Sequence, residues 1–480
     1  MKQRKRTKIV CTIGPSSNDL VILKKMIQAG MNVARLNFSH GEHKNHAELI
    51  QLIRRASEET NEPIAILQDL QGPKVRVGEL PNDGIALETG KLVVFSTEKN
   101  VSLPKIGLTY DALHNDVQPG DRLLLDDGLL EVKIVSVAGL DIQCEVMTGG
   151  TLFSHKGLNL PTATLGIPAI TEKDKKDMRF GILQGVDLVA LSFVRNAQEI
   201  RDLRCLIESF EEESVEKSKY HSSIQIIAKI EKHEAVKNID EIIEAADGIM
   251  IARGDLGIEM PAEEVPLIQK VVIDKCRKKA KPVIVATQML DSMIRNPRPT
   301  RAEVSDVANA VIDHTDAVML SGESATGKFP VETVETMSRI IHETEESRFD
   351  DVTTAGQFNH EDAGLAISEL ANFLARDIKA KLILVASISD RAGQIVSCYR
   401  PERPIFVPTL DDRGLRQSNL SWGVQPFMLP KCSTTEELID HSIGFFKKTK
   451  WVKSGDKIIV VAGESADISS KVNSIEIREV

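Results

Sequence analysis

Eight short apolar runs, separated by longer segments, constrain what the first three quarters of this chain can fold into. The runs are rich in Val and Ile, as are the strands of a parallel sheet that is buried on both faces. They span residues 7–14, 32–38, 64–70, 187–194, 224–231, 248–255, 282–287 and 317–323. Helical patterns at 19–30, 44–60, 263–281 and 300–313 lie between several of them. Eight strand–helix repeats predict a closed (β/α)8 TIM barrel.

Two stretches depart from this rhythm. Residues 74–171 contain scattered Gly and Pro and short alternating strands at 122–125 and 130–137. We therefore expect a small β-barrel domain, inserted after the third barrel strand as a lid. A helix at 361–378 and strands at 381–387, 404–407, 457–462 and 474–480 predict a doubly wound α/β domain over residues 347–480. The catalytic barrel is then assigned to residues 1–73 and 172–346.

Composition excludes several classes of protein. The formal net charge of −10 argues against a nucleic-acid binder, which needs a basic surface. No apolar run reaches the roughly 18 residues of a membrane helix, and the charged start leads into a strand rather than into a secretory signal. The six cysteines form no Cys-x-x-Cys pair, which indicates reduced thiols in a cytoplasmic protein.

Charged or hydroxyl residues close nearly every predicted barrel strand, and barrel enzymes hold their active sites at these strand ends. Lys229 and Glu231 lie two residues apart on one strand, so both side chains point to the same face. Asp255 closes the next predicted strand, which makes Glu231 and Asp255 neighbouring carboxylates. Two carboxylates with phosphate oxygens commonly hold Mg²⁺, and Lys229 adds the fixed positive charge that phosphoryl transfer needs. An internal ion pair is the alternative for Lys229.

Three further sequence patterns could indicate a binding site. Two glycines in the segment 252–257 follow a strand, and their backbone N–H groups are suited to binding a carboxylate or phosphate. Residues 322–328 fit Gly-x4-Gly-Lys, but Phe329 follows where a P-loop needs Ser or Thr, so we assign no P-loop. Of three histidines spaced by three, His43 and His46 are interpreted as surface residues, whereas His40 closes the second strand loop.

Several long motifs, in this order along the chain, resemble pyruvate kinase. They are residues 31–41 (MNVARLNFSHG), 227–231 (IAKIE), 251–257 (IARGDLG), 286–290 (ATQML) and 299–323. The resemblance spans the barrel, the insert and, more weakly, the C-terminal domain, and it is to the bacterial type without a C-terminal phosphohistidine domain. It implies the glycolytic transfer of a phosphoryl group from phosphoenolpyruvate to ADP, which gives ATP and pyruvate. It also implies a cytoplasmic homotetramer.

The resemblance further implies roles for individual residues. Glu231 and Asp255 hold Mg²⁺ or Mn²⁺, Lys229 stabilises the migrating phosphoryl group, and Arg35 contacts phosphate. Substrate binding also falls to Ser192, Ala252, Gly254, Asp255 and Thr287. Proton delivery to the enolate falls to Thr287, Ser321 and Glu323. The nucleotide contacts are Pro15, Asn37, His40, Arg76 and Lys156, and Asp127 meets the substrates when the lid closes.

This sequence departs from the family pattern at two places. Asn37, Ser39, Asp69 and Leu70 match the monovalent-cation site, but Lys74 stands where K⁺-dependent members have Glu. We expect the Lys74 ammonium to replace the ion, so that K⁺ is not required. The effector loop of the C-terminal domain reads SISDRA at 387–392, with a second acidic loop at 463–467. Acidic residues repel phosphate, so regulation by a sugar bisphosphate is doubtful, and Arg391 is the main reason to keep an effector open.

Two other functions remain open from the sequence. A metal-dependent barrel lyase acting on an oxoacid would also use Glu231 and Asp255, but nothing in it calls for Lys229, a β insert or a nucleotide. A non-catalytic scaffold on the same fold would be marked by loss of Lys229 or of a metal carboxylate, and all three residues are present.

Overall fold

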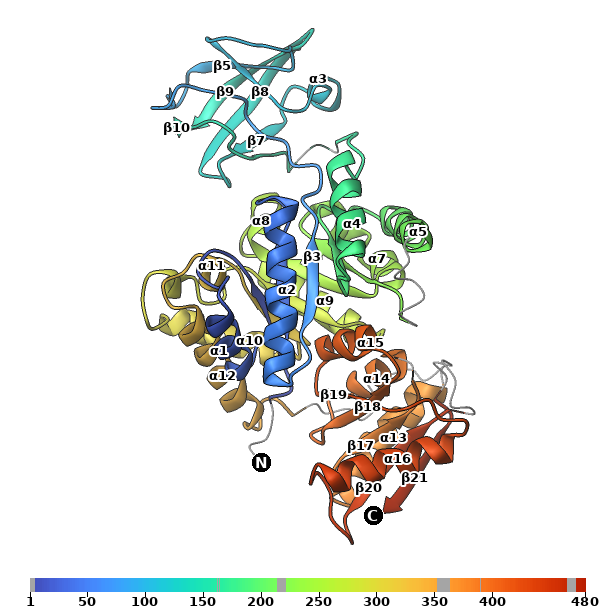
Figure 1. Ribbon diagram of the computed structural model, residues 1–480. Coiled ribbons are helices and arrows are strands. Elements are labelled where there is room, and N and C mark those ends of the chain that lie inside the picture. The colour runs from blue at the N-terminus through green and yellow to red at the C-terminus, as the bar shows by residue number, and fades with distance from the viewer. Residues whose placement is uncertain are drawn as a thin grey trace.

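A closed barrel of parallel strands forms the centre of the molecule (Figure 1). The computed structural model describes residues 5–161, 163, 165–213, 222–351, 363–388, 390–463 and 472–480. Within them, the barrel strands are β1 (Lys8–Thr12), β2 (Val33–Asn37), β3 (Ala65–Asp69), β12 (Leu188–Leu191), β13 (Gln225–Ile230), β14 (Gly248–Ala252), β15 (Val283–Ala286) and β16 (Ala317–Leu320). Each strand pairs with its neighbours in chain order, and β16 closes on β1. The predicted TIM barrel is confirmed.

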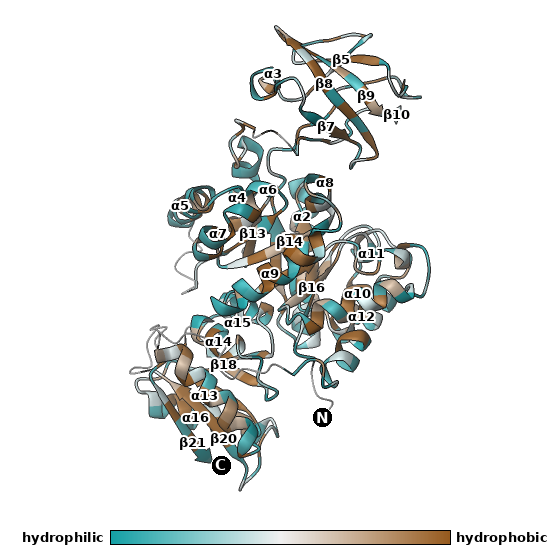
Figure 2. Cartoon of the chain, turned by 180° about the vertical axis from the view of Figure 1, so that it is seen from behind, coloured by the Kyte–Doolittle hydropathy of each residue, from teal (hydrophilic) through white to brown (hydrophobic). Residues whose placement is uncertain are grey.

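The barrel is packed on both surfaces of its strands. Inward-pointing residues such as Val10, Leu67 and Met250 form one apolar cluster inside the barrel. Their neighbours along the same strands, Ile9 and Ile249 among them, join a second cluster under the helices. This alternation follows from the two-residue repeat of a strand, and Figure 2 shows the strands β13, β14 and β16 as largely hydrophobic.

Clear end signals delimit several of the surrounding helices. Helix α1 (Leu20–Ala29) begins at Asp19, whose carboxylate accepts the N–H groups of Val21 and Ile22, and it ends at Gly30. Helix α10 (Arg301–Ile312) begins with a capping box between Thr300 and Glu303. The other long barrel helices are α2 (His43–Thr60), α4 (Glu172–Leu183), α5 (Ala197–Glu213), α9 (Val265–Lys278) and α12 (Pro330–Glu345).

Two predicted strands are shorter than expected. The run 248–255 was read as one strand, but β14 ends at Ala252 and helix α8 (Arg253–Glu259) begins at once. Likewise β16 ends at Leu320, and the one-turn helix α11 (Gly322–Ala325) follows. Asp255 and Glu323 therefore lie on short helices rather than at strand ends. A carboxylate in the first turn of a helix is favoured by the helix dipole.

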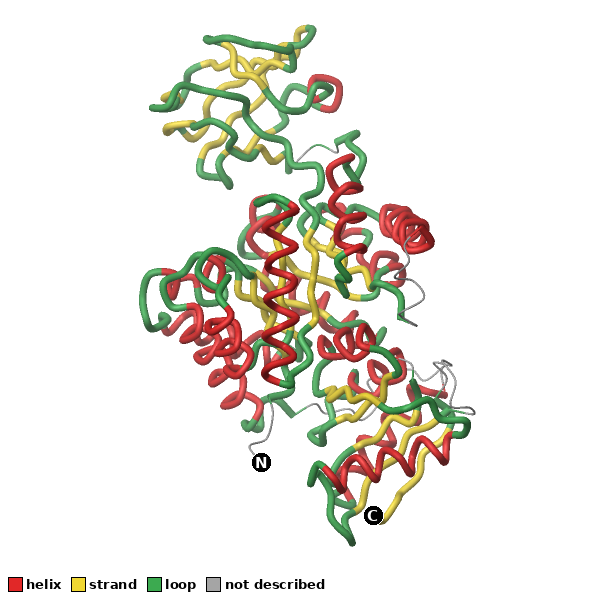
Figure 3. Tube along the Cα trace, in the orientation of Figure 1, coloured by secondary structure: helices red, strands yellow, loops and turns green. Residues whose placement is uncertain are grey.

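The inserted segment is mostly strands and loops, as Figure 3 shows, and it extends away from the barrel. Its strands are β4 (Ile85–Leu87), β5 (Leu92–Ser96), β6 (Lys105–Gly107), β7 (Arg122–Leu125), β8 (Leu130–Ala138), β9 (Asp141–Thr148), β10 (Gly150–Leu152) and β11 (Leu158–Asn159), with the short helix α3 (Leu113–Asp116). The larger sheet has the order β11-β7-β8-β9-β5-β6. Phe95, Leu123 and Val132 lie in an apolar core that belongs to this segment.

The C-terminal domain is a five-stranded sheet in the order β19-β18-β17-β20-β21. The strands are β17 (Ile383–Ala386), β18 (Ile405–Thr409), β19 (Val424–Met428), β20 (Lys457–Ala462) and β21 (Ser474–Glu479), and the last is antiparallel. Helices α13 (Ala363–Asp377) and α14 (Asp390–Ser397) pack on one face, and α16 (Thr435–Lys448) packs on the other. The doubly wound prediction is confirmed, although β19, an edge strand that contains Pro426, was not predicted.

Buried ion pairs join the C-terminal domain to the barrel. Helix α15 (Asp412–Gln417) places the Arg416 Nε atom 2.8 Å from Oδ1 of Asp187. The other carboxylate oxygen of Asp187 lies 2.8 Å from the Arg54 guanidinium. Arg400 pairs with Asp316 at 2.9 Å.

None of the helices in the described ranges combines the length and apolarity needed to cross a bilayer.

Candidate active site

A buried lysine sits where three neighbouring barrel strands end. Lys229, near the end of β13, places its Nζ atom 2.9 Å from Oε1 of Glu231 and 3.2 Å from Oδ1 of Asp69. The same atom donates a 2.8 Å hydrogen bond to the Ser192 hydroxyl, just beyond β12. Lys229 and Glu231 thus do point to one face, as predicted. The internal ion pairs of Lys229 are with Glu231 on its own segment and with Asp69 on β3, two strands away, rather than with a neighbouring strand as the alternative had it.

Arg35 completes this buried charge centre. Its Nε atom donates to Oδ2 of Asp69 at 2.6 Å, and a second nitrogen donates to the Thr12 hydroxyl at 2.9 Å. Burial alone would raise the pKa of Asp69, but the charges of Lys229 and Arg35 outweigh burial and lower it. Burial alone would lower the pKa of Lys229, but Asp69 and Glu231 raise it above its usual value. Both groups therefore stay charged at neutral pH.

The surroundings of Glu231 disfavour its charge. Only 1% of its side chain is exposed, and its Oε2 atom accepts the Phe193 N–H at 2.7 Å. Burial raises the pKa of Glu231, Lys229 opposes this, and the nearby charge of Asp255 raises it further. Two carboxylates that repel each other across a barrel mouth form a donor set that fits a hard divalent cation.

The loop after β15 is held in a strained conformation. Thr287 has φ +74, a left-handed backbone that is unfavourable for a β-branched residue. Its hydroxyl donates to the Ala286 carbonyl at 2.6 Å and accepts the Gly254 N–H at 2.8 Å. The Arg253 guanidinium reaches the Thr287 carbonyl at 2.9 Å and forms two 2.7 Å contacts with Asp306. Strain of this kind concentrates at functional sites, where surrounding contacts hold it.

The pair formed by Arg253 and Asp306 was not recognised from the sequence. The sequence places Arg253 at a strand end and Asp306 within a long motif. Their contact joins α8 to α10, so no spacing rule along the chain reveals it. The only signal in the sequence was a helical aspartate, Asp306. Aspartates on helices usually point to solvent, so this residue alone does not predict an ion pair.

Glu323 ties together the loops that follow β15 and β16. Its two carboxylate oxygens accept the N–H groups of Leu290 at 3.1 Å and Ser321 at 2.7 Å. Burial raises the pKa of Glu323 despite these hydrogen bonds. Gly322, the start of the rejected P-loop match, belongs to the one-turn helix α11.

The candidate nucleotide residues come from two sides of the barrel mouth. Pro15 and His40 are exposed on barrel loops, and the Asn37 side chain accepts the Ser39 N–H at 3.1 Å. On the insert, Arg76 donates to the His155 carbonyl at 2.9 Å and Lys156 pairs with Asp126 at 2.8 Å.

Lys74 lies on the insert side of a cleft that opens beside α8. It lines the cleft together with Asp127, Gly254 and Asp255. The partners of Asp69 are Lys229, Arg35 and Ser192. Within the described residues, Lys74, which was expected to replace K⁺, is not one of these partners, and it lines the cleft with Asp127 and Asp255 instead.

Two sequence interpretations need correction or qualification. His46 was expected at the surface, but it is buried and stacks on Phe38 with ring centroids 4.0 Å apart, because it lies on the inward face of α2. His43 is half-exposed, as expected. Arg391 donates to the carbonyl groups of Ala280 and Lys279, so it contacts the barrel. Ser389 and residues 464–467, which include the acidic Glu464 and Asp467, lie outside the described residues.

Fold and site together define a (β/α)8 barrel enzyme whose charged groups gather at the carboxyl ends of the strands. Residues 4–334 match the family description "Pyruvate kinase, barrel domain", and residues 365–478 match "Pyruvate kinase, alpha/beta domain". The chain belongs to the pyruvate kinase family. It is accordingly an ATP-forming phosphotransferase that uses phosphoenolpyruvate and ADP, and the lyase alternative finds no support.

Curated relatives and a solved structure agree with this assignment. A pyruvate kinase of Geobacillus stearothermophilus is 44% identical over 482 residues, which cover 99% of this chain and 81% of the relative. A pyruvate kinase of Clostridium acetobutylicum is 40% identical over 479 residues, which cover 99% of this chain and 99% of the relative. The crystal structure of a pyruvate kinase from Cryptosporidium parvum matches with a TM-score of 0.90 at 36% identity, covering 99% of this chain and 96% of that one.

Proposed function

We propose that Lys229, Arg35 and Ser192 bind the phosphoryl group that moves from phosphoenolpyruvate to ADP. The observation that supports this is the charge centre itself, in which two cations are held beside Asp69 at the barrel mouth. A transferring phosphoryl group spreads negative charge over its equatorial oxygens, and fixed positive charge stabilises that state. Asp69 acts as a positioning residue, because it holds Lys229 and Arg35 without reaching the substrate.

The reaction also needs a proton donor, and we assign this role to residues around Thr287. An ADP oxygen bonds to phosphorus while the bond from phosphorus to the enol oxygen breaks, which leaves the enolate of pyruvate. The enolate then takes a proton at its methylene carbon and becomes the ketone. Thr287, Ser321 and Glu323 are assigned to this delivery, and the raised pKa of Glu323 favours a group that holds a proton. Ala252, Gly254, Asp255 and Thr287 are assigned to the substrate carboxylate.

Glu231 and Asp255 would hold Mg²⁺, or Mn²⁺ in its place. Their mutual repulsion, which helps to raise the pKa of Glu231, is the feature that a divalent cation relieves. When bound, such a cation supplies positive charge to phosphate and enolate oxygens. Lys229 then keeps Glu231 oriented through their 2.9 Å contact.

The nucleotide is proposed to lie between Pro15, Asn37 and His40 on the barrel and Arg76 and Lys156 on the insert. Residues 74–171 would act as a lid, and closing would bring Asp127 to the substrates. Catalysis is proposed to proceed without K⁺. Lys74 lines the cleft beside Asp127 and Asp255 in this conformation, and closing of the lid would bring its ammonium to Asn37, Ser39, Asp69 and Leu70 in place of the ion.

We also propose a cytoplasmic homotetramer. Two helices expose apolar side chains that an assembly would cover. On α9 these are Leu267 and Val271, and on α13 they are Leu370 and Phe373, each more than half exposed. Two separate self-complementary surfaces are what a tetramer with two kinds of two-fold axis requires. Analytical ultracentrifugation measures the mass of the assembly. The single variants Phe373→Glu and Leu267→Glu should each disrupt one of the two surfaces and reduce the tetramer to a dimer.

The proposed roles are tested by the release of pyruvate from phosphoenolpyruvate with ADP and Mg²⁺ in Tris buffer. Lys229→Met should lower kcat by about a thousandfold, because it removes a fixed charge at the migrating group. Lys24→Met, which removes an exposed lysine paired with Glu59, is the matched control and should be neutral. Equal activity of Lys229→Met and the parent would reject the assignment of Lys229.

A further inference from the structure

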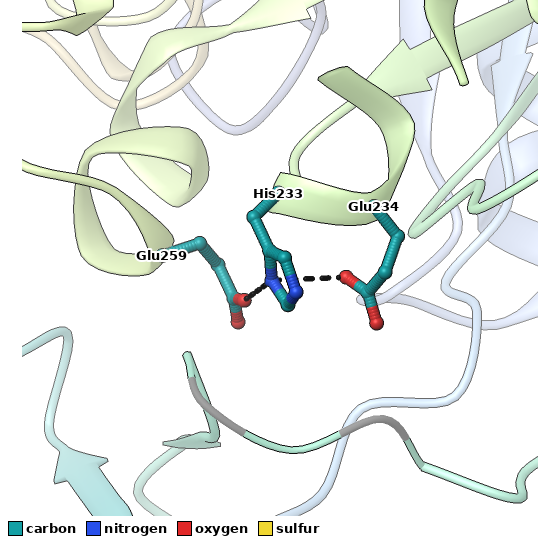
Figure 4. A group of neighbouring side chains, drawn as sticks. All are labelled: His233, Glu234 and Glu259. Atoms are coloured by element: carbon teal, nitrogen blue, oxygen red, sulfur yellow. Dashed lines mark ion pairs between the residues drawn. The ribbon is translucent and has the colours of Figure 1, made fainter. Parts of the chain in front are cut away.

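A cluster of one imidazole and two carboxylates lies apart from the buried charge centre, where the barrel approaches the insert (Figure 4). His233 and Glu234 begin helix α6 (His233–Lys237), and Glu259 ends α8. The Nδ1 atom of His233 lies 3.1 Å from Oε2 of Glu234 and 3.8 Å from Oε2 of Glu259. One ligand atom from each side chain lies within 4.8 Å of the other two. Figure 4 shows the imidazole between the two carboxylates, which approach it from opposite sides.

The most buried member of the cluster has an unsatisfied oxygen. The Glu259 side chain is 1% exposed, and its Oε2 atom, which points at His233, accepts no hydrogen bond from the described residues. The Nδ1 atom of His233 is also buried, and in the same ranges its 3.1 Å contact with Oε2 of Glu234 lacks the geometry of a hydrogen bond. Buried polar atoms without partners are rare, because each costs the free energy of its lost hydration. Two such atoms aimed at each other point to a missing ligand.

We propose that His233, Glu234 and Glu259 bind a divalent transition-metal cation of the zinc type. An imidazole nitrogen with two carboxylate oxygens is a ligand set that Zn²⁺ takes readily, with water in the fourth position. Mg²⁺ prefers oxygen ligands and keeps most of its waters. The histidine therefore separates this site from the Mg²⁺ site assigned to Glu231 and Asp255.

Lys232 limits how tightly this site binds. Its Nζ atom lies 2.9 Å from Oε1 of Glu259, and Asn159 of the insert approaches the same oxygen at 3.5 Å. The ammonium offsets one of the two carboxylate charges but leaves Oε2 of Glu259 and the Glu234 carboxylate facing the imidazole. A cation at the cluster would compete with Lys232 for Glu259, so removal of this ammonium should tighten metal binding.

The position of the cluster connects it to the segments that hold the proposed Mg²⁺ ligands. Glu231 precedes His233 by two residues, and Asp255 precedes Glu259 by one helical turn. A cation bound to His233 and Glu259 would cross-link α6 to α8. That cross-link would fix the separation of the two segments without touching the substrates. The inference does not depend on the proposed phosphoryl transfer.

Equilibrium dialysis against Zn²⁺ tests the proposal. The full-length Glu231→Gln/Asp255→Asn variant, in excess Mg²⁺, should bind one Zn²⁺ per chain. Adding His233→Asn should raise the Kd for Zn²⁺ by about tenfold or more, and adding Lys232→Met should lower it. Zn²⁺ binding that is unchanged by His233→Asn, or absent from the parent variant, would overturn the assignment. Thermal melts establish that each variant is folded.

A second measurement uses the unmodified chain, so the test does not depend on the folding of the double variant. Co²⁺ in a four-coordinate site with a nitrogen ligand absorbs visible light strongly, whereas Co²⁺ among six oxygens absorbs weakly. With Mg²⁺ in excess, added Co²⁺ should give the strong spectrum, and His233→Asn should abolish it. The same strong spectrum in His233→Asn, or only the weak one in the parent chain, would reject the site.

Discussion

The Arg35 Nε atom lies 2.6 Å from Oδ2 of Asp69, and the opposite oxygen of the same carboxylate lies 3.2 Å from the Lys229 ammonium. One fully buried carboxylate therefore holds two cations from two different strands. Without that carboxylate the two cations would repel each other in a poorly solvated place. Asp69 therefore helps to orient both cations, together with Glu231 on Lys229 and Thr12 on Arg35.

Asp69→Asn should lower kcat by about a hundredfold, because Arg35 and Lys229 both lose a charged partner. The pKa of Lys229 should also fall, since the charge of Asp69 is a main cause of its elevation. The alkaline limb of the pH–rate profile should accordingly move to lower pH. Rates measured from neutral to alkaline pH check this, and an unmoved alkaline limb would mean that Lys229 does not depend on Asp69.

The hydroxyl of Thr287 links the strained loop to the start of α8 through the Gly254 N–H at 2.8 Å. Thr287→Val keeps the shape but leaves that N–H without its acceptor, so the free energy of unfolding should fall by about 1 to 2 kcal/mol. Thr287→Ser keeps the hydroxyl and should retain stability and most activity. Urea denaturation with parallel rate measurements compares the two. Equal losses in both variants would contradict a role for the hydrogen bond.

Glu323 provides a pH-dependent contribution to stability. Burial raises its folded-state pKa above the unfolded value, so protonation favours the folded chain. The contribution is fully present below the unfolded pKa and is lost as pH rises through the folded pKa. The wild type should therefore lose stability relative to Glu323→Gln as pH rises above the unfolded-state pKa of about 4.3. Melting temperatures of both proteins across this range give the difference, and a constant difference would show that the pKa is not raised.

The C-terminal domain should be held to the barrel by the buried pair of Arg416 and Asp187, 2.8 Å apart. Removing one buried partner leaves an unpaired charge. Asp187→Asn should lower the free energy of unfolding by about 3 kcal/mol. A double-mutant cycle with Arg416→Met separates the pair from the contact of Asp187 with Arg54. A coupling energy near zero would assign the effect to the remaining contacts of Asp187, which are those with Arg54 and with the Ile66 N–H.

Sequence patterns were sufficient for the barrel because each strand is a continuous apolar run that ends in a polar group. They failed at the ends of β14 and β16, because the polar and glycine residues that follow Ala252 and Leu320 look like a strand end in the sequence but already lead into the short helices α8 and α11. His46 was misplaced because its burial depends on Phe38, a contact between elements. The cluster at His233 escaped notice for the same reason, since Glu259 reaches it from another helix.

Lys74 allows the sharpest test of the monovalent-cation proposal, because it lines the cleft shared with Asp127 and Asp255. In the parent chain the rate should be the same with and without K⁺. Lys74→Glu replaces a fixed positive charge by a negative one, which should suppress activity by about a hundredfold in the absence of K⁺ and restore most of it when K⁺ is added. Lys74→Met lacks both charges, so K⁺ should rescue it poorly. Steady-state rates in Tris buffer with K⁺ varied at constant ionic strength compare the three proteins. Strong activation of the parent chain by K⁺ would instead show that its Lys74 ammonium does not replace the ion.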